Sequence, residues 1–126
     1  STERFAAWWK ARHGQPLPRN LVGLREVDRF LRTHFLVFAL RHETLVDLGA
    51  LMGELARGLF DGAWSWDEAR ATGDITRAAV RWPELELYPI GRVYKMLVDQ
   101  PEGQGLDEFV RSVPAARAEM RQRVGS

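Results

Sequence analysis

The chain has 126 residues, of which 45% are hydrophobic and 28% charged, and a formal net charge of +1. This length predicts a single helical domain over residues 1–126, and the hydrophobic content excludes a disordered chain. The absence of cysteine excludes disulfides, thiolate metal sites and a cysteine nucleophile, and it suits a reducing, cytoplasmic location. The longest apolar run, residues 35–40, is too short to cross a membrane, so no membrane partner is expected.

Apolar residues recur at helical spacing from the beginning of the chain. Thr2 is a suitable N-cap for a helix that ends near His13, with Gly14 as its stop. A proline-containing loop follows over residues 15–20. The spacing then predicts a second helix over residues 21–41.

A third helix is predicted from an N-cap at Thr44 to about Leu59. Gly49 and Gly53 lie four residues apart on it. Glycine disfavours helix by about 1 kcal/mol relative to alanine, so this pair predicts that another helix packs closely against this one.

The second half of the chain is predicted to form shorter helices. Their expected ranges are 65–72, 75–82 with Asp74 as cap, 89–98, 106–113 and 114–124. No segment alternates strongly enough to predict a strand. The fold class expected from the sequence is therefore all-α, a compact bundle of six to eight helices.

Arginine is the dominant cation, with sixteen arginines against two lysines. Arg25, Arg29 and Arg32 recur at i, i+4 and i+7, which places them on one face of the second helix. Guanidinium groups match phosphate oxygens two at a time, so this face is a candidate nucleic-acid surface, although such a stripe is also typical of a solvated face. Other basic residues could extend it into a track: Arg12, Arg19, Arg77, Arg81, Arg92 and Lys95.

Charge is unevenly distributed along the sequence. Residues 1–43 hold eight Lys or Arg against four Asp or Glu, whereas residues 44–74 hold two against six. We expect the acidic part to face a basic protein neighbour. The predicted protein interface comprises Asp61, Asp67, Glu68, Asp74 and Trp9, since one of the adjacent Trp8 and Trp9 rings should face outward.

Catalytic and metal sites find no support in the sequence. His42-Glu43 begins like a zinc-protease motif, but position 46, where the second histidine belongs, is valine. Glu84 and Glu86 lie two residues apart and would not share a helix face. We therefore predict no catalytic residue, no metal ligand and no cofactor, and the chain is not expected to be an enzyme.

Two stretches of the chain resemble the small helical subunit of CRISPR effector (Cascade-type) complexes. The first comprises Glu3-Arg4-Phe5, Trp8, Lys10 and Gly14-Gln15; the second comprises His34-Phe35-Leu36-Val37 and Ala39-Leu40, before the helix that carries Gly49. Trp82-Pro83 and Leu106-Asp107-Glu108-Phe109-Val110 are looser similarities.

This resemblance implies an all-helical, non-catalytic subunit of a ribonucleoprotein complex in antiviral defence. Several copies would contact guide RNA or target DNA backbone and neighbouring effector subunits, while base pairing with the guide would read the sequence. The alternative from the residues alone is a helical protein-interaction adaptor or a homo-oligomeric scaffold that binds no nucleic acid. The tryptophan content and the Gly49/Gly53 pair favour that alternative.

Overall fold

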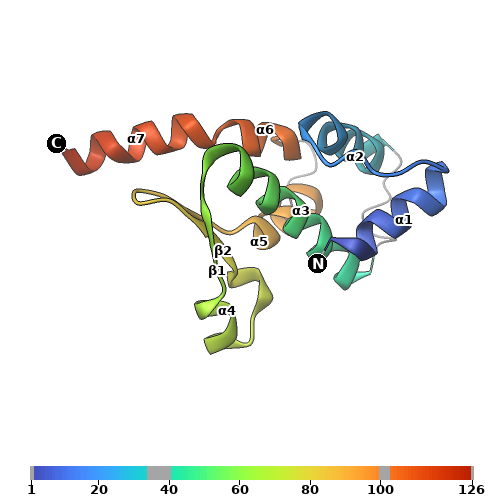
Figure 1. Ribbon diagram of the computed structural model, residues 1–126, viewed down its shortest axis with the longest axis horizontal. Helices are drawn as coiled ribbons and strands as arrows, with labels where there is room; N and C mark the ends of the chain where they lie inside the picture. The colour runs from blue at the N-terminus through green and yellow to red at the C-terminus, as the bar shows by residue number, and fades with distance from the viewer. Residues whose placement is uncertain (1, 34–40, 100–102, 126) are drawn as a thin grey trace.

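The computed structural model describes residues 2–33, 41–99 and 103–125. Within these ranges helices predominate and pack together, which confirms the predicted all-α bundle (Figure 1). The α-helices are α1 (Glu3–His13), α2 (Leu21–Thr33), α3 (His42–Phe60), α4 (Asp67–Thr72), α5 (Pro89–Tyr94), α6 (Leu106–Arg111) and α7 (Val113–Gly125). A 3-10 turn, η2 (Ile75–Arg77), follows α4, and a π-helical turn, η3 (Lys95–Asp99), continues α5.

Helix α3 is the centre of the bundle, and α1, α5 and α6 pack against it. A Cβ atom placed on Gly49 would lie 2.5 Å from the Cα atom of Ile90 in α5. A Cβ atom on Gly53 would lie 2.4 Å from the Trp64 ring. These separations leave no room for a side chain, so the predicted close approach to α3 is confirmed, with α5 as the partner helix.

Helix α1 has the predicted ends but an unexpected cap. Gly14 ends it in the left-handed conformation (φ 72°), as expected. Thr2 occupies the N-cap position, yet its hydroxyl accepts a hydrogen bond from Arg19 instead of capping the helix. The buried carboxylate of Asp47, on α3, accepts the main-chain N–H of Arg4 at 2.8 Å and its guanidinium at 2.8 Å. This hydrogen bond to Asp47 raises the pKa of the Arg4 guanidinium.

Helix α3 begins earlier than the sequence predicts. The N-cap is Arg41 rather than Thr44, because the Arg41 carbonyl already accepts the N–H groups of Thr44 and Leu45. The predicted extension of α2 through residues 34–40 lies outside the described residues. The second CRISPR-like stretch lies in that same segment.

A small antiparallel sheet, which the sequence analysis missed, extends from one side of the helices (Figure 1). It consists of β1 (Ala63–Ser65), β2 (Ala79–Arg81) and β3 (Glu86–Leu87), in that order. The predicted helix over residues 75–82 is therefore wrong after η2. Asp74 caps that single turn through the N–H of Thr76, and burial of three successive residues from Ala78 then favours an extended chain.

Helices α6 and α7 match the predicted pair, and α7 projects from the bundle in Figure 1. Glu84, at the β2–β3 turn, contacts Arg117 and Arg121 on α7. The hydrogen bond from Arg117 lowers the pKa of the Glu84 carboxyl. This cluster anchors α7 to the hairpin. None of the helices in the described ranges is long and apolar enough to cross a membrane.

Candidate nucleic-acid interface

The outward face of α2 presents two of the three predicted stripe arginines. Leu24, Val27 and Leu31 are fully buried on the core side of the helix, while Arg25 and Arg29 are exposed on the other side. Neither guanidinium has a hydrogen-bond or ion-pair partner among the described residues. Both cations are therefore available to bind phosphate.

Arg32, the third residue of the stripe, is used within the fold. Its Nε atom lies 3.1 Å from Asp28, and its Nη2 atom donates to the main-chain oxygen of Gln104 at 2.8 Å. Only 18% of its side chain is exposed. The carboxylate of Asp28 also accepts the N–H of Leu106, so the Arg32–Asp28 pair connects α2 to the beginning of α6.

Trp9 is buried, so its predicted exposure at a protein interface is wrong. Phe5 and Trp9, one helical turn apart, form the core face of α1. The Trp9 ring stacks on His13, with centroids 3.7 Å apart, and meets Phe30 of α2 edge-on. Trp8 is the more exposed of the two neighbouring tryptophans, and the guanidinium of Arg12 lies 5.6 Å from its ring centroid.

A recess of about 340 Å³ lies between α1 and α2, beside Arg29. Its lining residues are Trp9, His13, Glu26, Arg29, Phe30 and Thr33. His13 and Phe30 were not predicted as site residues, because contacts between two helices leave no signal in the local sequence spacing. The result is a free guanidinium next to aromatic side chains, an arrangement typical of surfaces that bind nucleic acid by charge and stacking.

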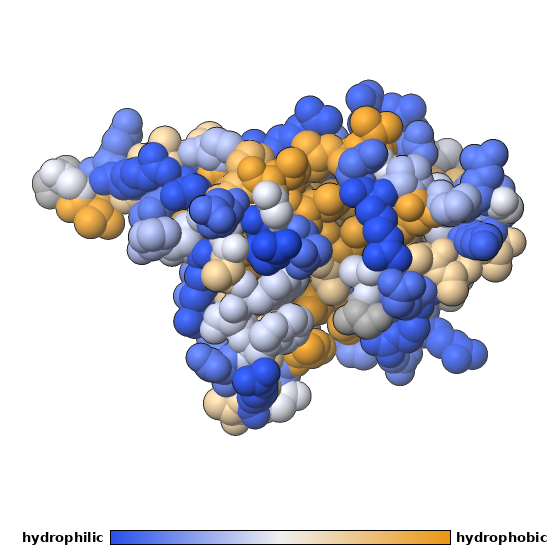
Figure 2. Space-filling view, in the orientation of Figure 1, coloured by the Kyte–Doolittle hydropathy of each residue, from blue (hydrophilic) through white to orange (hydrophobic). Residues whose placement is uncertain are grey.

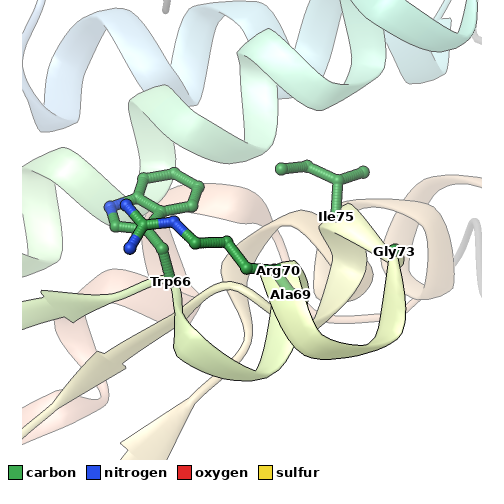
Figure 3. Close-up of a pocket in the computed structure, with 5 residues that line it drawn as sticks. All are labelled: Trp66, Ala69, Arg70, Gly73 and Ile75. Carbon is green, nitrogen blue, oxygen red and sulfur yellow. The ribbon is translucent and has the colours of Figure 1, made fainter.

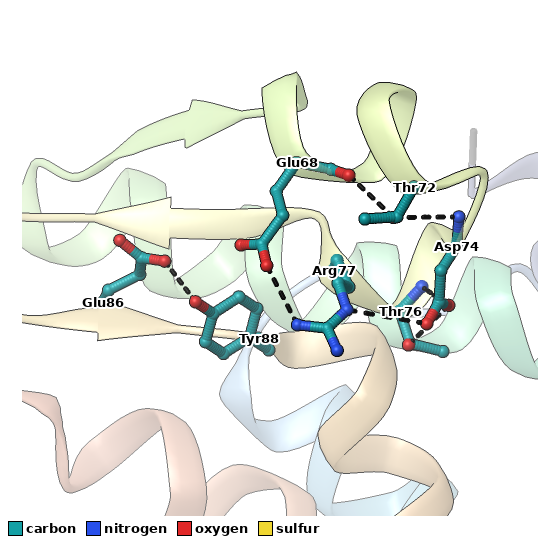
Figure 4. A network of polar contacts seen from close by, with 7 residues as sticks. All are labelled: Glu68, Thr72, Asp74, Thr76, Arg77, Glu86 and Tyr88. Carbon is teal, nitrogen blue, oxygen red and sulfur yellow. Dashed lines mark hydrogen bonds and ion pairs between the residues drawn. The ribbon is translucent and has the colours of Figure 1, made fainter.

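Three other predicted nucleic-acid-binding residues form ion pairs within the chain. Arg19 lies 3.0 Å from Glu3, and Arg81 lies 2.8 Å from Glu86 on the neighbouring strand. Arg77 contacts Glu68 at 2.9 Å and Asp74 at 3.8 Å, as Figure 4 shows. These arginines are partly neutralised, which weakens their attraction for a polyanion.

Two of the four acidic residues of the predicted protein interface form ion pairs in the same network. Glu68 and Asp74 face Arg77, and hydrogen bonds from Thr76 lower the pKa of the Asp74 carboxyl (Figure 4). Asp61 and Asp67 are exposed, with no ion pair in the described part of the chain. They are the two acidic residues of that set that remain available to a protein partner.

The predicted basic residues are not all on the face of α2. In the view of Figure 2, hydrophilic side chains lie at both ends of the molecule, with apolar surface between them. Arg92 and Lys95 line a recess formed by β3, α5 and α6, not the outward face of α2. Among the described residues, Arg92 and Lys95 therefore form a group separate from Arg25 and Arg29.

A third recess, of about 380 Å³, lies on α4 and contains an arginine that the sequence analysis did not select. Trp66, Ala69, Arg70, Gly73 and Ile75 line it, as Figure 3 shows. The Trp66 ring stacks on Trp64, with centroids 4.9 Å apart. The four-residue spacing of Trp66 and Arg70 was a signal that could have identified them as neighbours.

Glu84, Glu86 and His42 each contact other side chains of the fold. Glu84 contacts Arg117, whereas Glu86 contacts Arg81, so the two carboxylates lie against different arginines. His42 contacts the hydroxyl of Tyr94. Across the described ranges, no group of three or more His, Cys, Asp or Glu residues could hold a metal ion.

Comparisons with known proteins add no relative to this description. Protein-family models, curated proteins and solved structures give no significant match to the chain. The resemblance to CRISPR small subunits therefore remains a prediction that depends on the residues named in the sequence.

Proposed function

We propose that this protein is a non-catalytic subunit that holds a nucleic-acid backbone on the outward face of α2, within a CRISPR RNA-guided effector complex. The observation that supports this proposal is the pair Arg25 and Arg29. They lie one helical turn apart, both are exposed, and neither is paired within the described chain. In contrast, Arg19, Arg77 and Arg81 are paired with acidic residues.

Helix α1 extends this surface. Trp9 and His13 contact Phe30, so the end of α1 that carries Lys10 and Arg12 packs beside α2. Arginine and lysine side chains without a base-reading element position a strand but do not read its sequence. Guide RNA or target DNA would be bound by charge, and specificity would come from base pairing.

The same proposal assigns the remaining contacts to protein neighbours. Asp61 and Asp67 would meet basic surfaces of other effector subunits or of further copies of this chain. Such an assembly would function in the cytoplasm, where guide RNA and invading DNA meet.

Replacing both Arg25 and Arg29 by alanine tests this assignment. Salt dependence is the slope of log affinity against log salt concentration. We expect this slope to become shallower by roughly one to two units, because a complex with fewer phosphate contacts releases fewer counterions when it forms. Fluorescence anisotropy with labelled single-stranded RNA, single-stranded DNA and duplex measures this slope. Affinity should fall similarly for all sequences.

The control replaces Arg70, an exposed arginine with no ion pair in the described part of the chain, by alanine and so removes a positive charge away from α2. This control should keep the wild-type slope. Equal slopes for the wild type and the Arg25/Arg29 variant would refute the assignment. Absence of wild-type binding at about 50 mM salt, where backbone contacts are strong, would favour the adaptor instead.

A helical protein-interaction module is the second candidate, and exposed apolar side chains favour it. Val22 is 61% exposed, Leu59 53% and Val124 77%. This alternative predicts concentration-dependent self-association in analytical ultracentrifugation, without any response to polyanions.

A further inference from the structure

The recess that contains Arg92 and Lys95 has the size of a small-molecule site. Its volume is about 490 Å³, and small-molecule pockets typically occupy roughly 300–1,000 Å³. The side chains that matter to its chemistry are Tyr88, Arg92, Lys95, Gln104, Phe109 and Ser112. They come from the end of β3, from α5 with η3, and from α6 with the residues on either side of it.

Arg92 has an unusual environment in this recess. Its guanidinium lies 5.5 Å from the ring centroid of Phe109. Its Nε atom is buried and has no hydrogen-bond partner among residues 2–33, 41–99 and 103–125. A buried donor without an acceptor is destabilising and rare in native proteins, so it calls for an acceptor that the described chain does not supply.

Two further donors line the same recess without partners in the described ranges. Lys95 is exposed and lies three residues after Arg92, on the same side of the helix. The side-chain amide of Gln104 is also unbonded, since only its main-chain oxygen accepts a hydrogen bond, from Arg32. Three residues that carry hydrogen-bond donors therefore line one cavity.

The carboxylate in the lining of the recess is already paired. Glu86 is the carboxylate in the lining, and it contacts Arg81 and the hydroxyl of Tyr88. The Ser112 hydroxyl donates to the main-chain oxygen of Phe109. The two positive charges of Arg92 and Lys95 are consequently not balanced by a carboxylate of the described lining.

We propose that this recess binds a phosphate monoester, carried by a free nucleotide or by the 5′ end of a strand. The fork of Arg92 and the ammonium of Lys95 match the two negative charges of the phosphate, and Gln104 supplies a further donor. Leu87, Tyr88 and Phe109 provide apolar walls for the attached sugar and base. The site uses no residue of the α2 face, so it does not depend on the proposed function.

Calorimetry of the full chain with AMP, inorganic phosphate and adenosine tests the proposal. AMP and phosphate should bind, whereas adenosine should not. Lys95→Gln should weaken AMP binding by about tenfold, the effect of losing one charge-assisted hydrogen bond. Arg92→Met should abolish binding without lowering the Tm of the unliganded protein, because the buried donor without an acceptor is then removed.

Two controls make the result specific. Arg70→Gln removes an exposed arginine, with no ion pair to any described residue, from a different recess and should leave AMP binding unchanged. The Arg25/Arg29 double variant should also bind AMP normally, which separates this site from the α2 surface. Tighter binding of a 5′-phosphorylated than of a 5′-hydroxyl oligonucleotide would identify a strand end as the source of the phosphate, and equal binding would leave the free nucleotide.

Failure of both AMP and phosphate to bind would overturn the proposal. It would also be overturned if Lys95→Gln bound AMP as well as the wild type, or if Arg70→Gln weakened binding equally. Lys95 is exposed, so its variant remains informative even if Arg92→Met does not fold.

Discussion

Gly49→Ala is expected to lower the free energy of unfolding by about 1–3 kcal/mol, although alanine is the better helix former. The added Cβ atom would lie 2.5 Å from the Ile90 Cα atom and about 3 Å from its side chain. Main-chain atoms cannot rotate out of the way as a flexible side chain can. Helices α3 and α5 would have to separate, and contacts along their shared surface would weaken.

Urea denaturation measures this effect, and Gly58→Ala is the matched control on the same helix. A Cβ atom on Gly58 meets nothing within 4 Å, so this substitution should raise stability by up to about 1 kcal/mol. Opposite signs for the two variants would identify packing as the cause. Equal stabilisation of both would contradict the close approach of α5 to Gly49.

Asp47→Ala should lower the free energy of unfolding by about 2–4 kcal/mol. Asp47 is completely buried, and its carboxylate accepts both the main-chain N–H and the guanidinium of Arg4. Without it, the first turn of α1 loses an acceptor, and a small cavity remains in α3. Because this contact joins α1 to α3, its loss should also loosen the packing of Trp9 against Phe30.

Chemical denaturation, monitored by tryptophan fluorescence, tests the role of Asp47. The control is Glu26→Ala, which removes an exposed carboxylate from α2 and should change stability by no more than about 0.5 kcal/mol. A similar, small effect of both substitutions would show that the buried carboxylate does not hold α1 in place.

The features that the sequence predicted correctly depend on local chemistry. The stop at Gly14, the cap at Asp74 and the beginning of α5 at Pro89 each require only neighbouring residues. The glycine pair on α3 was informative because glycine destabilises a helix, so two glycines on one helix face indicate that another element packs closely there. These signals identified the helices and one tight packing contact.

The sheet could not be predicted because its strands have only two or three residues. Such segments are too short for alternation to be recognised, and their pairing depends on tertiary contacts. Trp82 shows the difficulty: its indole donates to the main-chain oxygen of Phe60, twenty-two residues earlier. That contact leaves no trace in local periodicity.

The candidate site was only partly predictable for the same reason. Helical spacing was sufficient to place Arg25 and Arg29 opposite the buried face of α2. It could not show that Arg77 would face Glu68, or that Arg81 on β2 would lie opposite Glu86 on the adjacent strand β3. Whether an arginine is free or paired depends on neighbours that are distant in the sequence. The sequence therefore predicted more free arginines on the surface than the structure has among its described residues.

The stacked indoles of Trp64, on β1, and Trp66, at the start of α4, give this part of the molecule an optical signature of its own. Their rings are 4.9 Å apart and inclined by 18°, close enough for their electronic transitions to couple. Coupled indoles produce paired circular-dichroism bands of opposite sign, whereas the helices dominate the peptide signal. The tryptophan pair and the helices therefore give separate circular-dichroism signals. The order in which these two parts form can be followed in one sample without a label.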